Sequence, residues 1–290
     1  MADTFWLLLR GSDAVGHACR RRKAPASRVV LLHGWLQTSA SWMKTATALR
    51  DEFGHDVLLL DFYGHGHSAV PPSSAQSLRY SMSPEGWMAQ LCERLAAIGW
   101  DHGQQLVLAG ASLGAAVAMQ YTCAHPSRVA RLNLIAPAGL PEPFWHGSHT
   151  VWIIPRAVCG FVDELPHRAQ SLVRAVTDLF QVTRTSPEYG VDIAKVLRLI
   201  EGDAEGKRGH GLHLTVYAAG WDVVHSPHRA FWESAAKPSG GRVRYRYLPR
   251  ATHWGVCARL YELGLHKDEE MWHGTCQNGI KTEGGVRARL

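Results

Sequence analysis

The chain has 290 residues, a 46% share of hydrophobic residues and a formal net charge of +6. This size and apolar content allow one large domain or two small ones with a buried core, and they exclude a disordered or fibrous protein. The six cysteines are scattered and form no C-x-x-C pair, so we expect reduced thiols in a reducing compartment.

The first elements in chain order are short. Residues 4–22 read as two strands around a Gly-Ser-Asp turn, and the apolar run at 5–9 is too short for a signal peptide or a membrane span. The basic cluster at 20–23 is interpreted as a solvated loop, because the other arginines are dispersed along the chain. We therefore expect a soluble, cytoplasmic protein with no transmembrane segment and no nucleic-acid partner.

Apolar strands then alternate with helical segments. Residues 28–35, 55–62, 105–110 and 131–139 are typical of strands buried on both faces, whereas 39–53, 83–99 and 113–125 have helical periodicity. Ser83 is expected to cap the second of these helices. This alternation predicts an α/β fold with a parallel sheet covered by helices on both faces.

The alternation stops at about residue 141 and returns at about residue 211. The sequence therefore predicts a core of residues 1–140 and 211–272, a helical cap inserted at 141–210, and a flexible tail at 273–290. In the second part of the core, 212–220 and 242–248 read as strands, and 227–237 and 256–264 read as helices. A polar, glycine-rich composition indicates a loose tail after about Met271.

A candidate nucleophile lies where the strand at 105–110 meets the following helix. The stretch reads Gly110-Ala111-Ser112-Leu113-Gly114, a pattern that occurs by chance but here has the strand-turn-helix context of a nucleophile elbow. Gly110 and Gly114 would relieve clashes beside the sharp turn. A serine hydroxyl needs a base, a group that orients the base, and donors for the oxyanion. The interpretation of Ser112 as a nucleophile thus depends on its partners.

Candidate partners follow three other strands. Gly34 lets a backbone N–H approach a reacting carbonyl, so the N–H groups of Trp35 and Leu113 are the candidate oxyanion donors. His253 lies in a loop just after the last strand and is the candidate base. Asp222 follows the strand at 212–220 and is the only aspartate between Asp203 and His253, which makes it the candidate acid.

Glu233 is the weaker rival of Asp222, since it falls in a predicted helix. The segment before the candidate acid reads Ala219-Gly220-Trp221-Asp222, and the first proline after it is Pro227. The acid is therefore the least secure member of the predicted triad.

These segments together resemble the α/β-hydrolase fold superfamily over nearly the whole chain to about residue 272. The order Ser112, Asp222, His253 matches that family's order of nucleophile, acid and base. The acid loop departs from the family's usual pattern, which has a glycine where Ala219 stands and a proline earlier than Pro227. The stretch from Asp61 to Ser68 is similar to the D-x-x-G-H-G-x-S loop of its single-cap members. The resemblance implies a mostly parallel eight-stranded sheet with helices on both faces and an inserted cap over the site. A serine at position 112 argues against the relatives that use aspartate there.

The resemblance implies a serine hydrolase that cleaves a carboxylic ester, or a thioester or lipid acyl ester, through an acyl-enzyme. We expect no cofactor and no metal, because Ser68 and Ala69 stand where a His65-Gly66-His67 metal motif would need Asp and His. Alternatives are a C–C bond hydrolase of a diketone acid, suggested by residues 135–143, and a ligand receptor with little turnover. Acyl transfer and the oligomeric state are left open.

The substrate is expected to be a small, apolar acyl or ester compound. Aromatic residues of the predicted cap could line its pocket or simply form the core of the cap: Phe144, Trp145, Trp152, Phe161 and Phe180. Cap arginines could meet an anionic head group or only face solvent: Arg156, Arg168 and Arg174. The last three residues, Ala288-Arg289-Leu290, resemble a variant of a peroxisomal address, a weak indication that depends on the source of the chain.

Overall fold

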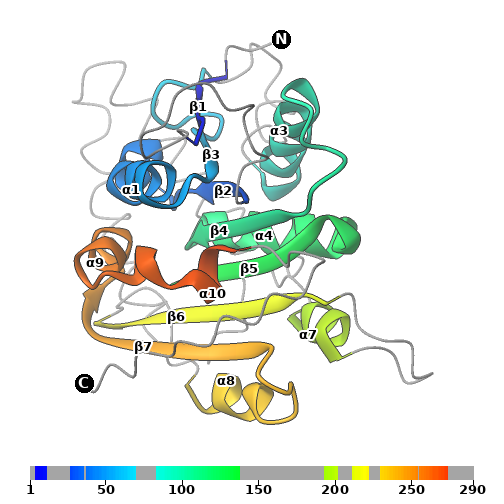
Figure 1. The fold of residues 1–290 in the computed structure, drawn as a ribbon, viewed down its shortest axis with the longest axis vertical. Helices are drawn as coiled ribbons and strands as arrows, with labels where there is room; N and C mark the ends of the chain where they lie inside the picture. Colours follow the sequence, from blue (N-terminus) through cyan, green and yellow to red (C-terminus); the bar gives the residue numbers. More distant parts are fainter. Residues whose placement is uncertain are drawn as a thin grey trace, which may run out of the picture.

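The structure of the chain is a computed structural model. It describes residues 4–11, 27–35, 37–69, 83–137, 193–201, 211–221, 229–253 and 255–273. Figure 1 shows a central sheet with helices on both sides. Among the described residues, no helix has the length and apolar character needed to cross a membrane.

The sheet has seven strands in the described residues, in the order β1-β3-β2-β4-β5-β6-β7. Only β1 is antiparallel to its neighbour β3, and the other pairs are parallel. The strands are β1 (Trp6–Leu9), β2 (Arg28–Leu32), β3 (Asp56–Leu60), β4 (Leu106–Ala111), β5 (Val129–Ile135), β6 (His213–Trp221) and β7 (Val243–Thr252).

Helices cover both faces of this sheet, as the alternation predicts (Figure 1). One face carries α3 (Pro84–Ala97), α4 (Leu113–Ala124), α7 (Ile193–Glu201) and α8 (Arg229–Ala236). The other carries α1 (Met43–Phe53), α9 (Val256–Glu262) and α10 (Glu269–Trp272). Short 3-10 helices are η1 (Ser39–Trp42), η2 (Pro126–Arg128) and η5 (Leu265–Lys267).

Alternate residues of one strand pack into two separate hydrophobic cores, one on each face of the sheet. In β2, Val30 and Leu32 pack under α3 and α4, whereas Val29 and Leu31 pack under α1. All four side chains are fully buried, as expected for a strand covered on both faces. The Ser83 side chain accepts a hydrogen bond from the N–H of Gly86 and caps α3 as predicted.

The strand order has a topological switch point at β2. From β2 the chain passes to β3 on one side and then to β4 on the other, so the order of the strands reverses there. Ligands of open α/β sheets bind at such a switch point, outside the carboxyl ends of the strands. We therefore expect a ligand site among the segments that follow β2, β3, β4 and β7.

Several predictions about the domain layout fall partly outside the described residues. The eighth strand was expected within residues 4–22, of which 12–26 are not described. The cap predicted at 141–210 is described only at α7, whose residues Ile193, Val196 and Ile200 pack into the core beside α4. The boundaries of the cap remain a prediction.

The last described helix, α10, lies at the predicted end of the core, residue 272. Met271 and Trp272 are each only 1% exposed, because α10 packs them against the sheet. The Asn133 side-chain amide donates to the Met271 carbonyl oxygen and holds this end of the chain. The core therefore extends through Trp272.

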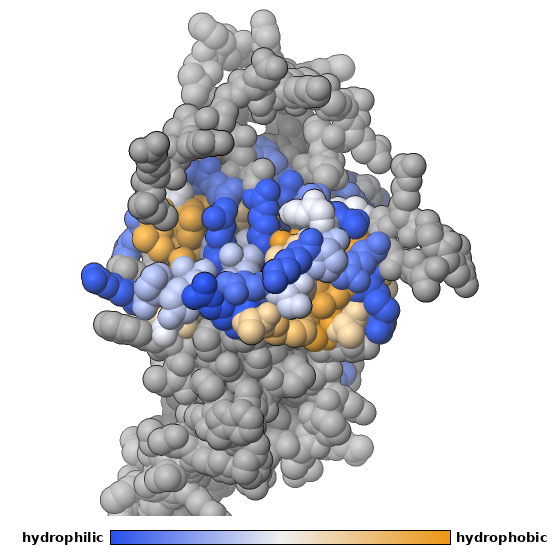
Figure 2. All heavy atoms as spheres, turned by 90° about the horizontal axis from the view of Figure 1, so that it is seen from below, coloured by the Kyte–Doolittle hydropathy of each residue, from blue (hydrophilic) through white to orange (hydrophobic). Residues whose placement is uncertain are grey.

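The β7 edge of the sheet carries exposed charge. Arg246 and Arg250 are exposed on β7, and Tyr247 and Phe231 are exposed on β7 and α8. Figure 2 views this side of the molecule, where hydrophilic side chains lie across the surface beside hydrophobic ones. Charged side chains on an edge strand discourage pairing with another chain.

Candidate active site

Ser112 lies at a sharp turn between β4 and α4. Its φ of 50° and ψ of −113° are unusual for a residue with a side chain, and such a conformation costs about 1 to 3 kcal/mol. The Ser112 N–H donates to the Ile135 carbonyl oxygen at 2.9 Å, and the Ser112 carbonyl accepts from the N–H of Ala115 at 3.0 Å. These bonds to the sheet and to α4 stabilise the strained turn.

Two glycines permit this turn for steric reasons. A Cβ on Gly110 would lie 2.2 Å from the Gly114 carbonyl oxygen, and one on Gly114 would lie 2.4 Å from the Leu32 carbonyl oxygen. Both contacts are with backbone atoms, which cannot move aside as a side chain can. The structure therefore has the elbow that the G-x-S-x-G pattern indicates.

His253 follows β7 directly and reaches Ser112. Its Nε2 atom lies 2.9 Å from the Ser112 Oγ atom, within hydrogen-bond distance. Both residues are largely buried, at 6% and 9% exposure, so water competes little for this contact. A serine hydroxyl bonded to an imidazole nitrogen is the arrangement that lets a histidine take up the serine proton.

The loop after β2 is held against Ser112. A Cβ on Gly34 would lie 3.2 Å from the Ser112 Cβ, so the absence of a side chain allows this close approach. The Gly34 N–H donates to Gln37 Oε1 at 3.0 Å, and the Gly34 carbonyl oxygen accepts from the Gln37 N–H at 3.2 Å. Gln37 thus fixes both polar groups of Gly34.

His33 fixes the same carbonyl from the other side. The Phe62 N–H donates to His33 Nε2 at 3.0 Å, so that nitrogen carries no proton. The proton of the neutral ring is then on Nδ1, which donates to the Gly34 carbonyl oxygen at 2.7 Å. Burial, together with the neighbouring His65, lowers the pKa of His33 to about 4. His33 is therefore neutral at physiological pH and has one fixed tautomer.

These bonds also orient the peptide that ends in the Trp35 N–H. Gly34 C=O and Trp35 N–H belong to one planar, trans peptide unit and point in opposite directions. Since the carbonyl is held by His33 and Gln37, the N–H is directed away from both. Leu113, the other predicted donor, is the first residue of α4, where N–H groups and the helix dipole favour negative charge.

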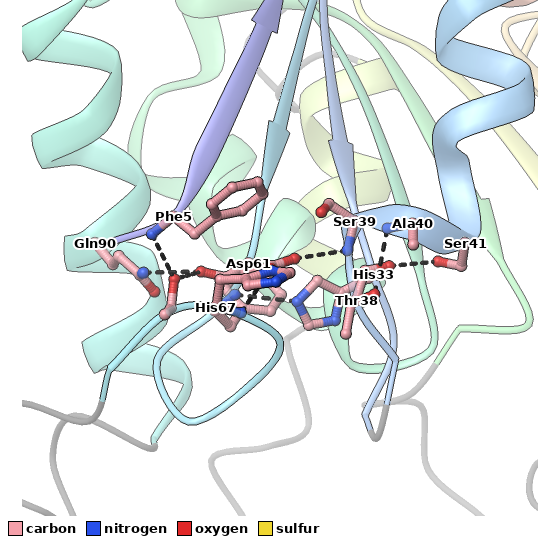
Figure 3. A network of polar contacts seen from close by, with 11 residues as sticks. Phe5, His33, Thr38, Ser39, Ala40, Ser41, Asp61, His67 and Gln90 are labelled. Carbon is pink, nitrogen blue, oxygen red and sulfur yellow. Dashed lines mark hydrogen bonds and ion pairs between the residues drawn. The ribbon is translucent and has the colours of Figure 1, made fainter. Parts of the chain in front are cut away.

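Asp61 forms the centre of a buried polar network beside this loop (Figure 3). Its carboxylate accepts from the N–H of Ser39 at 2.6 Å and from the N–H of His67 at 3.0 Å. Burial alone would raise the pKa of Asp61, but the hydrogen bonds from Ser39 and His67 hold it below its ordinary value. Its carboxyl group is therefore ionised and accepts hydrogen bonds only.

The predicted acid, Asp222, lies outside the described residues, so its position relative to His253 remains a prediction. Its rival Glu233 lies on α8, as expected, where its side chain is about half exposed and pairs with Arg229 at 2.7 Å. The Glu233 carboxylate is therefore engaged in an ion pair at the protein surface. The predicted pocket residues of the cap are not described, and neither are the last three residues of the chain.

The two histidines of the H-x-H motif, His65 and His67, lie in different environments. His65 is buried beside Trp87 and His33, whereas the side chain of His67 is 80% exposed and lies near Asp61. Within the described ranges, no three His, Cys, Asp or Glu side chains are grouped so that they could hold a metal ion.

Sequence reasoning missed the residues that support the loop. Asp61 was noted only as part of a motif, and His33, Gln37 and Ser39 were not singled out. A charged residue directly after an apolar run, as Asp61 is after residues 57–60 of β3, was the one available signal. Its partner Ser39 is 22 residues away, and only the tertiary structure brings the two together.

Comparisons with known proteins agree with this architecture. The family model described as alpha/beta hydrolase fold matches residues 27–157. A pimeloyl-[acyl-carrier protein] methyl ester esterase of Aeromonas hydrophila is 34% identical over 135 residues, which are 46% of this chain and 45% of the relative. A 2-hydroxymuconate semialdehyde hydrolase of Pseudomonas putida is 28% identical over 54% of this chain and 48% of the relative. The chain thus spans about half the length of these curated relatives.

A solved structure extends the similarity to the whole fold. A thermophilic esterase from Thermogutta terrifontis superimposes with a TM-score of 0.54 at 18% identity, covering 92% of this chain and 93% of the esterase. At this identity the match concerns the fold alone.

Proposed function

We propose that this chain is a serine hydrolase of the α/β-hydrolase fold superfamily and that it cleaves a carboxylic ester. The observation that carries the proposal is the 2.9 Å contact between His253 Nε2 and Ser112 Oγ at a strained elbow. The matched curated relatives include methyl ester esterases, which favours an ester over other acyl compounds.

The reaction proceeds through an acyl-enzyme. His253 Nε2 takes the proton of Ser112 as its Oγ attacks the ester carbonyl, and the carbonyl oxygen becomes an oxyanion. The tetrahedral species then collapses, the bond to the alkoxy group breaks, and His253 returns the proton to the leaving alcohol. Water, deprotonated by His253, attacks the acyl-Ser112 ester, and release of the acid restores the free serine.

The N–H groups of Trp35 and Leu113 hold the oxyanion in this proposal. Two features support them: the Gly34 carbonyl is fixed on the side opposite the Trp35 N–H, and Leu113 opens a helix whose dipole favours negative charge. Asp222 orients His253 and stabilises its protonated form, as the sequence predicts. No cofactor or metal takes part in these steps.

The substrate class is proposed from the relatives and from the predicted cap. The name of the Aeromonas relative specifies the methyl ester of an acyl chain carried on a protein. We propose a small, mainly apolar acyl ester here, held by cap residues, in a soluble protein of the cell interior. A second candidate is hydrolysis of a carbon–carbon bond in a diketone acid, which the sequence of residues 135–143 suggests. One of the matched relatives is named a 2-hydroxymuconate semialdehyde hydrolase.

Hydrolysis of p-nitrophenyl esters tests the proposal. Wild-type protein should release p-nitrophenol with a preference for one acyl chain length, and Ser112→Ala should lose at least a thousandfold in kcat, on the order expected for loss of the nucleophile. Ser127→Ala changes an exposed serine of η2 and should retain the full rate. Activity that Ser112→Ala retains would contradict the proposal, and binding of esters without turnover would favour a ligand receptor.

A further inference from the structure

The loop between β2 and η1 is held at both ends by two consecutive residues that follow β3. At its start, the Phe62 N–H donates to His33 Nε2 at 3.0 Å. At its end, the Asp61 carboxylate accepts from the Ser39 N–H at 2.6 Å. Figure 3 shows Asp61 between the loop that carries His33 and Ser39 and the segment that carries His67. The end of β3 therefore sets the position of the loop that carries the Trp35 N–H.

Asp61 is itself fixed by contacts that do not involve this loop. Its second carboxylate oxygen accepts from the N–H of His67 at 3.0 Å. Its backbone carbonyl accepts from Ser68 Oγ at 2.6 Å and from the Gln90 side-chain amide at 3.0 Å. A Cβ on Gly66 would lie 2.0 Å from the carboxylate, so the segment wraps closely around it. The carboxylate is thus a rigid, buried acceptor.

The connection from Ser39 to the Trp35 N–H is short. Ser39 begins η1, which Thr38 caps by accepting from the Ala40 N–H at 3.3 Å. Gln37, which directly precedes Thr38, makes the two hydrogen bonds that fix the N–H and C=O groups of Gly34. A shift of Ser39 would therefore move Gln37 and, with it, the Gly34–Trp35 peptide.

We infer that Asp61 is a positioning residue, which through its hydrogen bond to the Ser39 N–H holds the Trp35 N–H in place to stabilise the oxyanion. The inference rests on the proposed function, because it needs a reaction in which an oxyanion forms. A carboxylate suits the role because both of its oxygens face N–H donors. An asparagine would turn an amide N–H toward one of these donors and weaken the contact.

Two variants weaken or remove the contact from opposite sides. Asp61→Asn keeps the shape of the side chain but loses the charge. Ser39→Pro deletes the N–H donor together with the hydroxyl, and proline is acceptable there because Ser39 is the first residue of η1 and Thr38 before it is extended. Ser39→Ala is the matched control: it removes the hydroxyl, which also bonds to Asp61, but keeps the N–H. Ser127→Ala is a second control, since this exposed serine of η2 makes no contact with Asp61.

The informative readout compares a p-nitrophenyl ester with its thiono analogue, in which sulfur replaces the carbonyl oxygen and accepts hydrogen bonds poorly. Asp61→Asn and Ser39→Pro should each lower kcat for the oxygen ester by about tenfold, with a smaller change in KM. They should also lower the ratio of the oxygen-ester rate to the thionoester rate. Ser39→Ala and Ser127→Ala should keep the wild-type ratio, even if the melting temperature of Ser39→Ala falls.

The outcomes separate this inference from the proposed function. If wild-type protein hydrolyses the ester and depends on Ser112, but folded Asp61→Asn keeps the wild-type kcat and ratio, the positioning role is wrong and the proposed function stands. If wild-type protein shows no Ser112-dependent hydrolysis, both are wrong. Should Ser39→Pro fail to fold, the isosteric Asp61→Asn variant decides the question.

Discussion

The Nε2 atom of His253 lies 2.9 Å from the Oγ atom of Ser112, although 141 residues separate them in the sequence. Ser112 follows β4 and His253 follows β7, and β5 and β6 lie between these strands. Strands three positions apart in a sheet are about 14 Å from each other. The turn after β7 must therefore carry His253 back across the carboxyl end of the sheet. The chain then enters α9, which packs on the same face as α1 (Figure 1).

The glycines of the elbow should be indispensable for folding. Gly110→Ala would place a Cβ 2.2 Å from the Gly114 carbonyl oxygen and should lower the free energy of unfolding by about 3 kcal/mol or more. Gly103→Ala is the matched control, because its nearest atom would be 3.9 Å away and only its φ of +78° opposes a side chain. That variant should cost about 1 to 2 kcal/mol. Urea unfolding measures both, and equal losses would contradict the steric account.

Two substitutions of His33 should distinguish the contributions of its two hydrogen bonds to the reaction rate. In His33→Asn, the amide nitrogen can replace Nδ1 and still donate to the Gly34 carbonyl oxygen. In His33→Gln, the amide oxygen can replace Nε2 and accept from the Phe62 N–H, but the donor to Gly34 is lost. Because Gly34 C=O shares a peptide unit with the Trp35 N–H, we expect His33→Gln to have a kcat about tenfold below that of His33→Asn. A higher kcat for His33→Gln, in steady-state ester hydrolysis, would refute this assignment.

The stability of the protein should fall in mild acid in part because of His55. This side chain is fully buried between Phe53 and His273, and neither ring nitrogen has a hydrogen-bond partner among the described residues. Burial, together with His273, lowers the pKa of His55 from 6.5 to about 4. Below pH 6.5 the unfolded chain binds a proton that the folded chain does not bind until about pH 4, so stability is lost as the pH falls through this window.

The variant His55→Phe isolates this contribution. It cannot bind the proton, so its free energy of unfolding should change less between pH 7 and pH 4 than that of the wild type. The difference should be on the order of 3 kcal/mol at pH 4. Urea unfolding at several pH values measures it, and parallel pH profiles for the two proteins would show that His55 does not titrate in this way.

Much of the core fold could be predicted from the sequence because its signals are local. The apolar run of β2 and the capping serine of α3 identify a doubly covered strand and a helix start without tertiary information. Ser112 and His253 were predicted for a similar reason, since each follows a strand and precedes a helix. Parallel strands then bring such loops to one edge of the sheet.

The rest depends on contacts between distant residues. The Ser39 N–H can donate to the Asp61 carboxylate, and the Phe62 N–H can fix the tautomer of His33, only because β3 and β2 lie side by side. Local sequence patterns were enough to single out Ser112 and His253 as candidates, whereas the residues that support the neighbouring loop become visible only in the tertiary structure.

The acid of the triad should be Asp222. Asp222→Asn should lower kcat by roughly ten-thousandfold, because the amide stabilises the wrong tautomer of the histidine and cannot balance its charge. Glu233→Gln is the control, and since that side chain pairs with Arg229 at the surface, kcat should stay near that of the wild type. Ester hydrolysis under saturating substrate measures both. A large loss in Glu233→Gln with little change in Asp222→Asn would reverse the assignment.

Labelling with a fluorophosphonate probe tests the central claim most directly, because the probe reacts with a serine whose proton a neighbouring base removes. Wild-type protein should be labelled at Ser112, identified by mass spectrometry of its peptide. Ser112→Ala should not be labelled, and folded His253→Ala should be labelled far more slowly. A folded wild-type protein that resists the probe, or labelling that persists in Ser112→Ala, would contradict the assignment of Ser112 as an activated nucleophile.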